Sequence, residues 1–402
     1  MTNMRGSGRM DVNVIDDERD FASVWPSWDG LAMASSEPYC SPAWMAAWWR
    51  HARPRGAKLR TIAVHEGDRL TGIAPFFARR TVAGVMRYRF LGAGCSPRVD
   101  MLAARGRESA VASAVATCLD NMRSPPGSLL FDGVRESSPW PALLSASWSS
   151  DHPLNLSSEF GWDAPFLVTA GGGFDGWLAA KSSNFRQSLR RKRRHLERQG
   201  ATFGRVTTEA ELEPALDDLA RLHRLRWDDR GGSRVLVRGV EQMLRDAGRD
   251  LLGLGRFDIW RIEVDGRCIS SHLFLTAGHE TAYWLGGFDP AWARYQPSML
   301  ALVDAIEHAF DDHLARVDLG TGAQPYKLRF TDDVESIRWI NAIPKGSMGP
   351  LARADLAPRR ARVAVAQRLS PKTKQQIRAT VTRVRSLLRP FHAGESGQPN
   401  LE

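Results

Sequence analysis

The spacing of apolar and polar residues divides the chain into two halves with a similar order of predicted elements. In the first half, apolar runs at 59–80, 86–94 and 99–104 predict strands, and helical spacing at 108–124 predicts a helix. A buried strand at 127–134 follows. Strands, a helix and strands within one domain length indicate a mixed α/β unit.

The second half shows the same order more clearly. Its long helix starts with a capping box, in which Thr208 is followed three residues later by Glu211. We predict helices at 181–200, 208–230 and 237–249, three strands within 251–289, a helix at 298–313, and strands at 315–322 and 334–343. The last strand is expected to return to the sheet of the second half. We therefore predict two tandem α/β sandwich domains with mixed, largely antiparallel sheets.

Length and composition fit this organisation. A chain of 402 residues suits two domains with extensions, and 43% apolar with 25% charged residues is typical of a globular protein. No apolar run is long enough to span a membrane, and the first twenty residues lack the apolar segment of a secretory signal. The four cysteines are scattered singly, which argues against a zinc site or a disulfide framework. We expect a cytoplasmic protein that can also bind peripherally to the inner face of the membrane.

The net charge of +10 is concentrated in two segments. Residues 181–200 carry eight basic and one acidic residue (+7), and residues 351–402 carry eleven and three (+8), which leaves −5 for the rest. From Lys372 onward, Ile377, Val381 and Val384 recur at three- and four-residue spacings between basic residues. This pattern predicts a basic amphipathic helix that contacts an anionic membrane surface; the alternative is a disordered, solubilising end.

The segment 280–310 begins as a strand and ends as a helix. Gly286 and Gly287 allow a ligand to approach the main chain, and free amides at such a strand can polarise a carbonyl. Pro297 and Ser298 stand where the helix begins, and a helix N-terminus receives phosphate. Acyl transfer from a thioester carried on a pyrophosphate-bearing cofactor needs both features. The alternative is an ordinary bulge followed by a capped helix.

Several motifs of the second half resemble the GNAT acyltransferase superfamily, specifically the tandem-GNAT CelD/BcsL-like proteins of bacterial exopolysaccharide synthesis, which are relatives of the FemAB aminoacyltransferases. The similar segments are, in order, "NFRQSLRRKRRHLERQG", "LARLHRLRW", "DGRCISSHLFL", "TAYWLGGFDPAWARYQPSMLALVDAIEHA" and "RVDLGTGAQPYKLRF". The resemblance implies a GNAT-like domain at 1–160 on the acceptor side, a catalytic GNAT domain that binds the donor at 161–345, and a basic tail at 346–402. It also implies acetyl-CoA or another acyl-CoA as co-substrate, without a metal.

One segment departs from the superfamily pattern. The pyrophosphate loop of these enzymes usually carries glycines, whereas this chain reads "RYQPSMLA". The helix still offers amides and a serine hydroxyl, so phosphate binding is retained as a hypothesis. An aminoacyl-tRNA donor, as in the FemAB relatives, stays open.

The resemblance and the residue types together give a set of candidate site residues. Asp318 or a water is expected to take the acceptor proton, Tyr326 to protonate the leaving group and Lys327 to neutralise negative charge. His272 is a further candidate base, with a hydrogen-bonded core histidine as the alternative. The donor is expected to meet Trp284, Gly286, Gly287, Gln296, Ser298 and Met299. The acceptor is expected to meet Arg226, Trp227, Arg190 and Arg194.

These observations favour an N- or O-acyltransferase that acts on a sugar-like or cell-envelope precursor. The first alternative is FemAB-like transfer from aminoacyl-tRNA. The second is a membrane-associated scaffold of a polysaccharide synthesis complex without catalysis. Binding of other nucleic acids ranks third, because no recognised binding module accompanies the basic segments.

Overall fold

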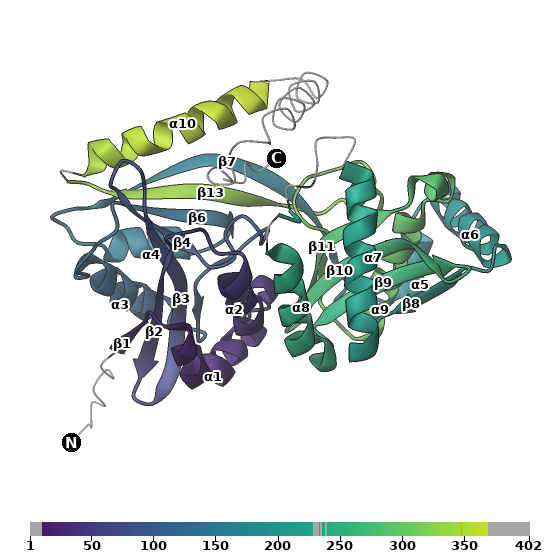
Figure 1. The fold of residues 1–402 in the computed structure, drawn as a ribbon, viewed down its shortest axis with the longest axis horizontal. Helices are drawn as coiled ribbons and strands as arrows, with labels where there is room; N and C mark the ends of the chain where they lie inside the picture. Colours follow the sequence, from purple (N-terminus) through teal and green to yellow (C-terminus); the bar gives the residue numbers. More distant parts are fainter. Residues whose placement is uncertain (1–9, 228–232, 234, 238, 347, 369–402) are drawn as a thin grey trace, which may run out of the picture. The chain divides into compact units, whose positions relative to one another are not determined.

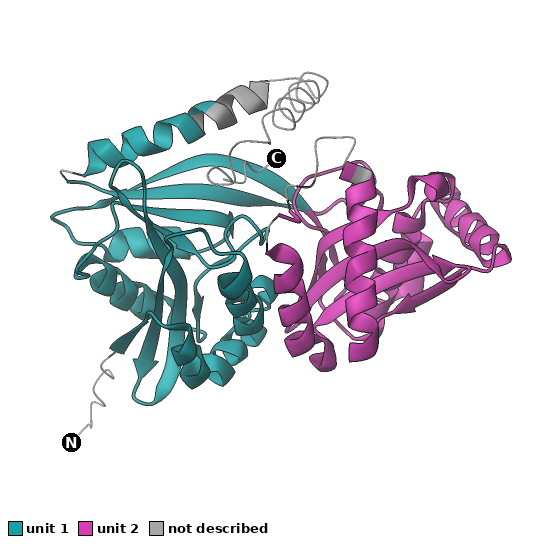
Figure 2. Cartoon of the chain, viewed as in Figure 1, with its two compact units in different colours: residues 1–164, 334–361 teal, residues 165–333, 362–402 magenta. Residues whose placement is uncertain are grey.

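The computed structural model describes residues 10–227, 233, 235–237, 239–346 and 348–368 (Figure 1). The chain divides into two compact units (Figure 2). Unit 1 comprises residues 1–164 and 334–361, and unit 2 comprises residues 165–333 and 362–402.

Unit 1 is built on a sheet with strand order β1-β2-β3-β4-β6-β13-β7. Its strands are β1 (Met10–Ile15), β2 (Lys58–Glu66), β3 (Arg69–Arg80), β4 (Met86–Phe90), β6 (Ser128–Arg135), β13 (Val334–Pro344), the first part of β7 (Leu154–Val168), and the short β5 (Leu102–Ala103) paired with β3. Its helices are α1 (Phe21–Ala34), α2 (Pro42–His51), α3 (Glu108–Asp120), α4 (Trp140–Ser147) and α10 (Gly349–Arg368), of which the residues up to 361 belong to this unit.

Unit 2 has the strand order β7-β12-β11-β10-β9-β8, with the last residues of β7 at one edge. Its strands are β8 (Thr202–Arg205), β9 (Phe257–Val264), β10 (Arg267–Ala277), β11 (Glu280–Phe288) and β12 (Arg316–Asp318). Its helices are α5 (Phe174–Ala180), α6 (Ser183–Arg198), α7 (Glu209–Trp227), α8 (Val240–Leu251) and α9 (Pro297–Asp311), with short 3-10 turns η5 (Pro290–Tyr295) and η6 (Lys327–Arg329).

Unit 2 forms an α/β sandwich. On one face of the sheet α7 packs against β10 and β11, and α8 packs against α7. On the other face the apolar side of α9 forms a core with β9 and β10. The predicted stripe of α6 joins that core, because Phe185, Leu189 and Leu196 are all buried. One half of the capping box of α7 forms, since Glu211 Oε2 accepts hydrogen bonds from the backbone N of Thr208 at 3.1 Å and from its hydroxyl at 2.8 Å.

The two units repeat one order of elements, as the sequence pattern predicts. In unit 1, β2, β3 and β4 pair antiparallel, α3 follows, and β6 then pairs parallel to β4. In unit 2, β9, β10 and β11 pair antiparallel, α9 follows, and β12 pairs parallel to β11. A parallel pair requires such a crossover connection, here a helix in both units.

The last strand does not follow the prediction. Residues 334–343 were expected to return to the sheet of the second half, but β13 pairs antiparallel with β6 of unit 1 over Ile337–Ala342. The free edge of β12 is instead taken by the end of β7, where Phe166–Val168 pair antiparallel with Arg316–Asp318. The expected ranges 161–345 and 346–402 therefore differ from the compact units, since β13 and the first part of α10 lie in unit 1.

Candidate active site

The candidate site of unit 2 starts where two parallel strands part. β12 pairs with β11 only through Glu280, Thr281 and Ala282, so the pairing with β12 ends before Tyr283. On its other side β11 stays paired with β10 as far as Phe288. One edge of β11 is therefore without a β12 partner beyond Ala282.

A β-bulge lies in this segment of β11, beyond its pairing with β12. Leu285 is opposite Leu273 and Tyr283 is opposite Phe274, so Trp284 is the extra residue of β11. A bulge bends its strand and turns local main-chain groups out of the regular ladder. Trp284 itself is buried, with 7% of its surface exposed, so its side chain packs into the fold.

The two glycines after the bulge are explained by packing inside the protein. A Cβ on Gly287 would lie 2.4 Å from the backbone N of His223 and 2.4 Å from the backbone C of Leu222, so this glycine lets α7 approach the strand closely. A Cβ on Gly286 would lie 2.0 Å from His272 Nδ1. The space that a side chain would need at either glycine is thus occupied by other parts of the protein. Close packing explains both glycines, in place of the predicted approach of a ligand.

Two histidines and a tyrosine surround Gly286. His223 Nδ1 lies 3.3 Å from the Gly286 carbonyl oxygen and its Nε2 lies 2.9 Å from Ser233 Oγ. Because a carbonyl only accepts, Nδ1 carries the proton of His223. His272, also buried, has its Nε2 3.1 Å from Ser270 Oγ. The ring of Tyr283 lies 5.7 Å from that of His272.

Tyr283 stands at the point of parting. It is the first residue of β11 beyond the β12 pairing, and its hydroxyl would lie 2.7 Å from a Cβ on Gly286. The ring is half-buried. Sequence reasoning missed Tyr283 and His223 as candidates. The signal for Tyr283 was its position just before the two glycines, in "TAYWLGG".

The loop after β12 is braced by two of the predicted catalytic residues. Asp318 Oδ1 accepts a hydrogen bond from Gly320 N at 2.7 Å, and Lys327 Nζ donates to the carbonyl oxygens of Gly320 and Thr321, both at 2.9 Å. Both side chains are almost fully buried. A Cβ on Gly320 would lie 3.0 Å from the Tyr283 carbonyl oxygen, so this brace holds the loop against the parting point. Tyr326 is half-buried against the α9 core.

The start of α9 combines an unusual backbone with one buried hydroxyl. Gln296, the N-cap, has φ 52°, and its side chain makes no cap hydrogen bond. Its Oε1 instead accepts from Lys192 Nζ of α6 at 2.5 Å. Ser298 Oγ is buried without a hydrogen-bond partner among the described residues, and the Met299 side chain is buried in the core. The helix start is therefore not closed by its own side chains and has a cation beside it.

Charged groups link α6 to the same helix. Arg193 donates to Asp304 of α9 at 2.5 Å, while burial raises the pKa of Asp304 and the Arg193 guanidinium opposes this. Burial, together with Arg329 and Arg191, lowers the pKa of Lys192. A phosphate at this place would relieve the repulsion among the three cations.

The predicted acceptor residues are not gathered around the parting point. Arg190 and Arg194 are exposed on α6, where Arg194 Nε donates to the Arg190 carbonyl oxygen at 3.3 Å. Trp227, at the end of α7, is half-buried beside His223, with ring centroids 6.0 Å apart. The side chain of Arg226 lies outside the described part of the structure.

Unit 1 fills the corresponding position with its own chain. β4 and β6 pair through Arg87–Arg89, and the connection that follows β4 folds back onto β6. There Val99 N donates to the Gly133 carbonyl oxygen at 2.9 Å, and a Cβ on Gly133 would lie 2.4 Å from the Pro97 carbonyl oxygen.

Part of the sequence and most of the fold are similar to known proteins. Residues 183–328 match a family described as "Acetyltransferase (GNAT) domain", a range that lies entirely within unit 2. Unit 2 therefore contains a GNAT acetyltransferase domain. No curated protein matches the sequence.

Three solved structures are similar in fold over most of the chain. FemX has a TM-score of 0.56 at 10% identity, with 82% of this chain and 96% of FemX covered. A conserved protein of unknown function from Bacteroides thetaiotaomicron has a TM-score of 0.51 at 11% identity, covering 83% and 100%. The C-terminal domain of a putative lysylphosphatidylglycerol synthetase from Agrobacterium fabrum has a TM-score of 0.50 at 12% identity, covering 85% and 96%. At these identities the similarity concerns the fold alone.

The described residues show neither a membrane-spanning helix nor a metal-binding cluster. Within that part of the chain, no helix combines the length and apolar character needed to cross a bilayer. The same residues contain no group of three or more His, Cys, Asp or Glu side chains placed to hold a metal ion.

Proposed function

We propose that the protein is an acyltransferase that moves an acyl group from acyl-CoA to a sugar-like or cell-envelope precursor, in the manner of the CelD/BcsL-like proteins. The observation that carries the proposal is the parting of β11 from β12 after Ala282, with a bulge at Trp284 and the start of α9 nine residues after the end of β11, inside a domain that matches GNAT acetyltransferases. Such a gap admits a thioester beside main-chain donors, and the helix start admits phosphate.

The residues around Gly286 then take chemical roles. The acceptor oxygen or nitrogen attacks the thioester carbonyl and a C–O or C–N bond forms, while main-chain N–H groups near Trp284 stabilise the oxyanion. His272, oriented by Ser270, receives the acceptor proton. The C–S bond breaks and the Tyr283 hydroxyl protonates the leaving thiolate. Asp318 and Lys327 hold the adjoining loop in place.

The roles of Tyr283 and Tyr326 can be separated by kinetics. Tyr283→Phe is expected to lower kcat for acetyl-CoA turnover by about 10²-fold, the usual contribution of a positioned general acid, with KM nearly unchanged. Tyr326→Phe serves as the matched variant, since Tyr326 was the proton donor expected from the sequence. Loss of kcat in Tyr326→Phe with full activity in Tyr283→Phe would reverse the assignment.

A second candidate is transfer from an aminoacyl-tRNA, in the manner of the FemAB proteins. It is favoured by the absence of glycine from "RYQPSMLA" and by the fold similarity to FemX and to the lysylphosphatidylglycerol synthetase domain. Isothermal titration with CoA separates the two. Micromolar binding of CoA supports the acyl-CoA proposal, whereas no binding of CoA together with binding of aminoacyl-tRNA supports the second.

A further inference from the structure

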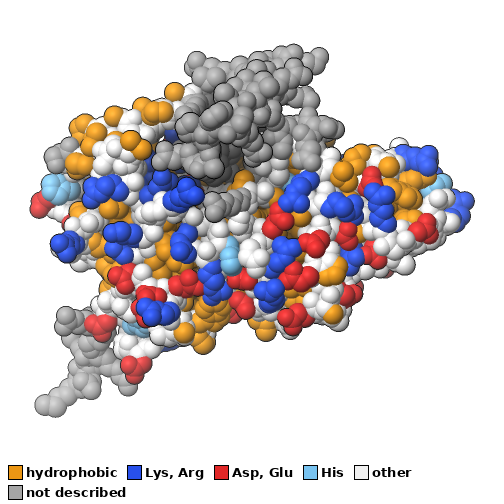
Figure 3. All heavy atoms as spheres, viewed as in Figure 1, with side chains coloured by type: hydrophobic (Ala, Val, Ile, Leu, Met, Phe, Trp, Pro, Cys, Tyr) orange, Lys and Arg blue, Asp and Glu red, His pale blue; other side chains and the backbone are white. Residues whose placement is uncertain are grey.

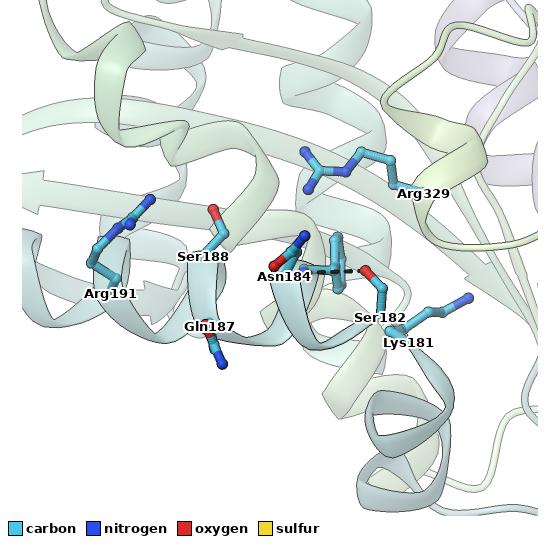
Figure 4. Close-up of a pocket in the computed structure, with 8 residues that line it drawn as sticks. Lys181, Ser182, Asn184, Gln187, Ser188, Arg191 and Arg329 are labelled. Atoms are coloured by element: carbon cyan, nitrogen blue, oxygen red, sulfur yellow. Dashed lines mark hydrogen bonds between the residues drawn. The ribbon is translucent and has the colours of Figure 1, made fainter.

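A cation-lined cavity lies on the surface of unit 2, apart from the residues around Gly286. It has a volume of about 460 Å³ and is lined by Lys181, Ser182, Asn184, Phe185, Gln187, Ser188, Arg191 and Arg329. Seven of these come from the start of α6 and the residues just before it, and Arg329 comes from η6 after β12 (Figure 4). Two segments distant in the sequence therefore build one concave surface.

The polar groups of the cavity converge. Asn184, Ser188 and Arg191 follow one another at spacings of four and three residues, which places them on one face of α6. Figure 4 shows these side chains pointing to the same side of the helix, with the Arg329 guanidinium reaching over the helix start from η6. Arg329 is held there by contact with the buried Phe185 ring, 5.0 Å from its guanidinium carbon.

The side chains that line the cavity carry only positive charge. Lys181, Arg191 and Arg329 line the cavity, no lining residue is acidic, and none of the three forms an ion pair with a described residue. Asp332 and Asp333 act on Lys181 from outside the cavity and raise its pKa, against the larger effect of burial, which lowers it. Figure 3 shows further Lys and Arg side chains on the surface of unit 2 where α6 lies.

Size and polarity define the ligand. A volume of about 460 Å³ is in the range that holds a small organic molecule and exceeds what a bare inorganic ion needs. The single apolar residue of the lining, Phe185, is 4% exposed, so the cavity surface is more polar than apolar and does not favour an acyl chain. Two guanidinium groups and a lysine are suited to a doubly charged phosphate, and Asn184 with Ser188 is suited to hydroxyl groups.

We propose that this cavity binds the phosphomonoester group of a polar small molecule, with Arg191 and Arg329 on the phosphate and Asn184 and Ser188 on its polar body. The phosphate can belong to a phosphorylated sugar-like molecule or to the 3′-phosphate of CoA. Lys192 extends the positive charge of the cavity toward α9. Its ammonium group is repelled by Arg329 and Arg191, and it donates a hydrogen bond to Gln296 at the start of α9. With a phosphorylated sugar-like molecule the site goes beyond the proposed acyl transfer, and with CoA it rests on that proposal; the test separates the two.

The test is isothermal titration of the full chain with glucose 1-phosphate, CoA and 3′-dephospho-CoA. Arg329→Gln and Arg191→Gln are the test variants. Arg198→Gln is the matched control, because Arg198 is exposed on the same helix and does not line the cavity. Thermal unfolding of each variant checks that it folds.

Each outcome of the titrations supports or overturns the proposed phosphate site. A loss of affinity for glucose 1-phosphate of tenfold or more in both test variants, and none in the control, supports a separate phosphorylated ligand. The same loss for CoA but not for 3′-dephospho-CoA supports the phosphate of the donor. Unaltered affinity for every probe in both variants, or no saturable binding of any probe to the wild type at 10 mM, would overturn the site. Failure of CoA alone, with glucose 1-phosphate still bound, would count against the acyl-CoA donor and leave the cavity assignment intact.

Discussion

At the scale of residues, the candidate site shows how burial decides between chemical and supporting roles. Asp318 and Lys327 have the residue types of catalysis, but their polar atoms face the loop that follows β12. Tyr283 and His272 lie around Gly286 at the point where the strands part. Residue type and sequence motif identified the loop after β12 as part of the site. The hydrogen bonds in the structure show that Asp318 and Lys327 hold this loop, whereas Tyr283 and His272 lie around Gly286.

The role of Asp318 is testable with an isosteric change. Asp318→Asn keeps an oxygen that accepts from Gly320 N, so we expect turnover of acetyl-CoA within a few-fold of wild type. Asp318→Ala leaves that buried N–H unsatisfied and is expected to lower the free energy of unfolding by about 1–3 kcal/mol. The measurements are steady-state kinetics and chemical denaturation. A folded Asp318→Asn protein that has lost turnover 100-fold would make Asp318 the general base after all.

A second residue, in unit 1, predicts a pH effect on stability. Burial raises the pKa of Asp100 to about 8, and Ser138 and Arg135 oppose this. The folded state therefore holds this proton more tightly than the unfolded state, so this carboxyl makes the protein less stable as pH rises from about 4 to about 8. We expect Asp100→Asn to gain stability relative to wild type between pH 5 and pH 9 in chemical denaturation.

The control for Asp100 is Asp120→Asn, an exposed carboxylate at the end of α3. Its stability difference from wild type should stay nearly constant between the two pH values. A constant difference for Asp100→Asn as well would show that this carboxyl is already ionised in the folded state at pH 5.

At the scale of elements, periodicity predicted the order and type of most helices and strands of both halves, but it did not predict β1, α1 or the long strand β7. Periodicity depends on residues close together in the sequence, however, whereas the strand with which another strand pairs can lie far away in the sequence. The run 334–343 is a strand as expected, but its partner β6 lies about 200 residues earlier, and the end of β7 occupies the edge that it was expected to join. Likewise the positions of Gly286 and Gly287 were visible in the sequence, whereas the close approach of α7 was not.

The first part of α10 illustrates the same limit and yields a prediction. Composition assigned it to a basic tail, yet Ala352 and Leu356 are fully buried against Val85, Leu130 and Ile343 of unit 1. We expect Leu356→Ala to lower the free energy of unfolding by about 2–5 kcal/mol, since it removes buried apolar contacts. Its control, Leu351→Ala on the same helix, removes a side chain that is 40% exposed and should cost far less. Equal small effects of both changes in chemical denaturation would mean that α10 does not dock as described.

Ion pairs accompany this docking. Arg87 pairs with Asp355 of α10, and Arg359 Nε lies 3.0 Å from Glu159 Oε2. Some of the basic charge that the sequence assigned to a membrane-facing tail is therefore used inside unit 1. The remaining candidate for such a tail is the stretch from 369 to 402, which lies outside the described residues.

At the scale of the whole molecule, residues 369–402 predict contact with an anionic membrane surface. Residues 369–402 carry six basic and two acidic residues, 6 − 2 = +4. Basic residues near anionic lipid contribute about 1 kcal/mol each. We propose that the full chain floats with phosphatidylglycerol vesicles and that a chain ending at residue 368, which retains α10, floats less. Vesicles of neutral lipid are the control, and equal flotation of both chains with anionic vesicles would remove the tail as a membrane contact.

The repeated order of elements assigns different roles to the two units in our account. In unit 1 the connection after β4 folds back onto β6, whereas in unit 2 the pairing of β11 with β12 ends at Ala282. The donor should therefore bind in unit 2 alone. The resemblance of the sequence implied the same division, with the acceptor side at 1–160 and the donor site at 161–345.

The most direct test of this central claim is a crystal structure of the full chain with CoA bound. We predict that the pyrophosphate lies at the start of α9, near Ser298 and Lys192, and that the thiol end lies in the opening beside Tyr283 and Trp284. CoA bound in unit 1, or bound in unit 2 away from the parting of β11 and β12, would contradict the account.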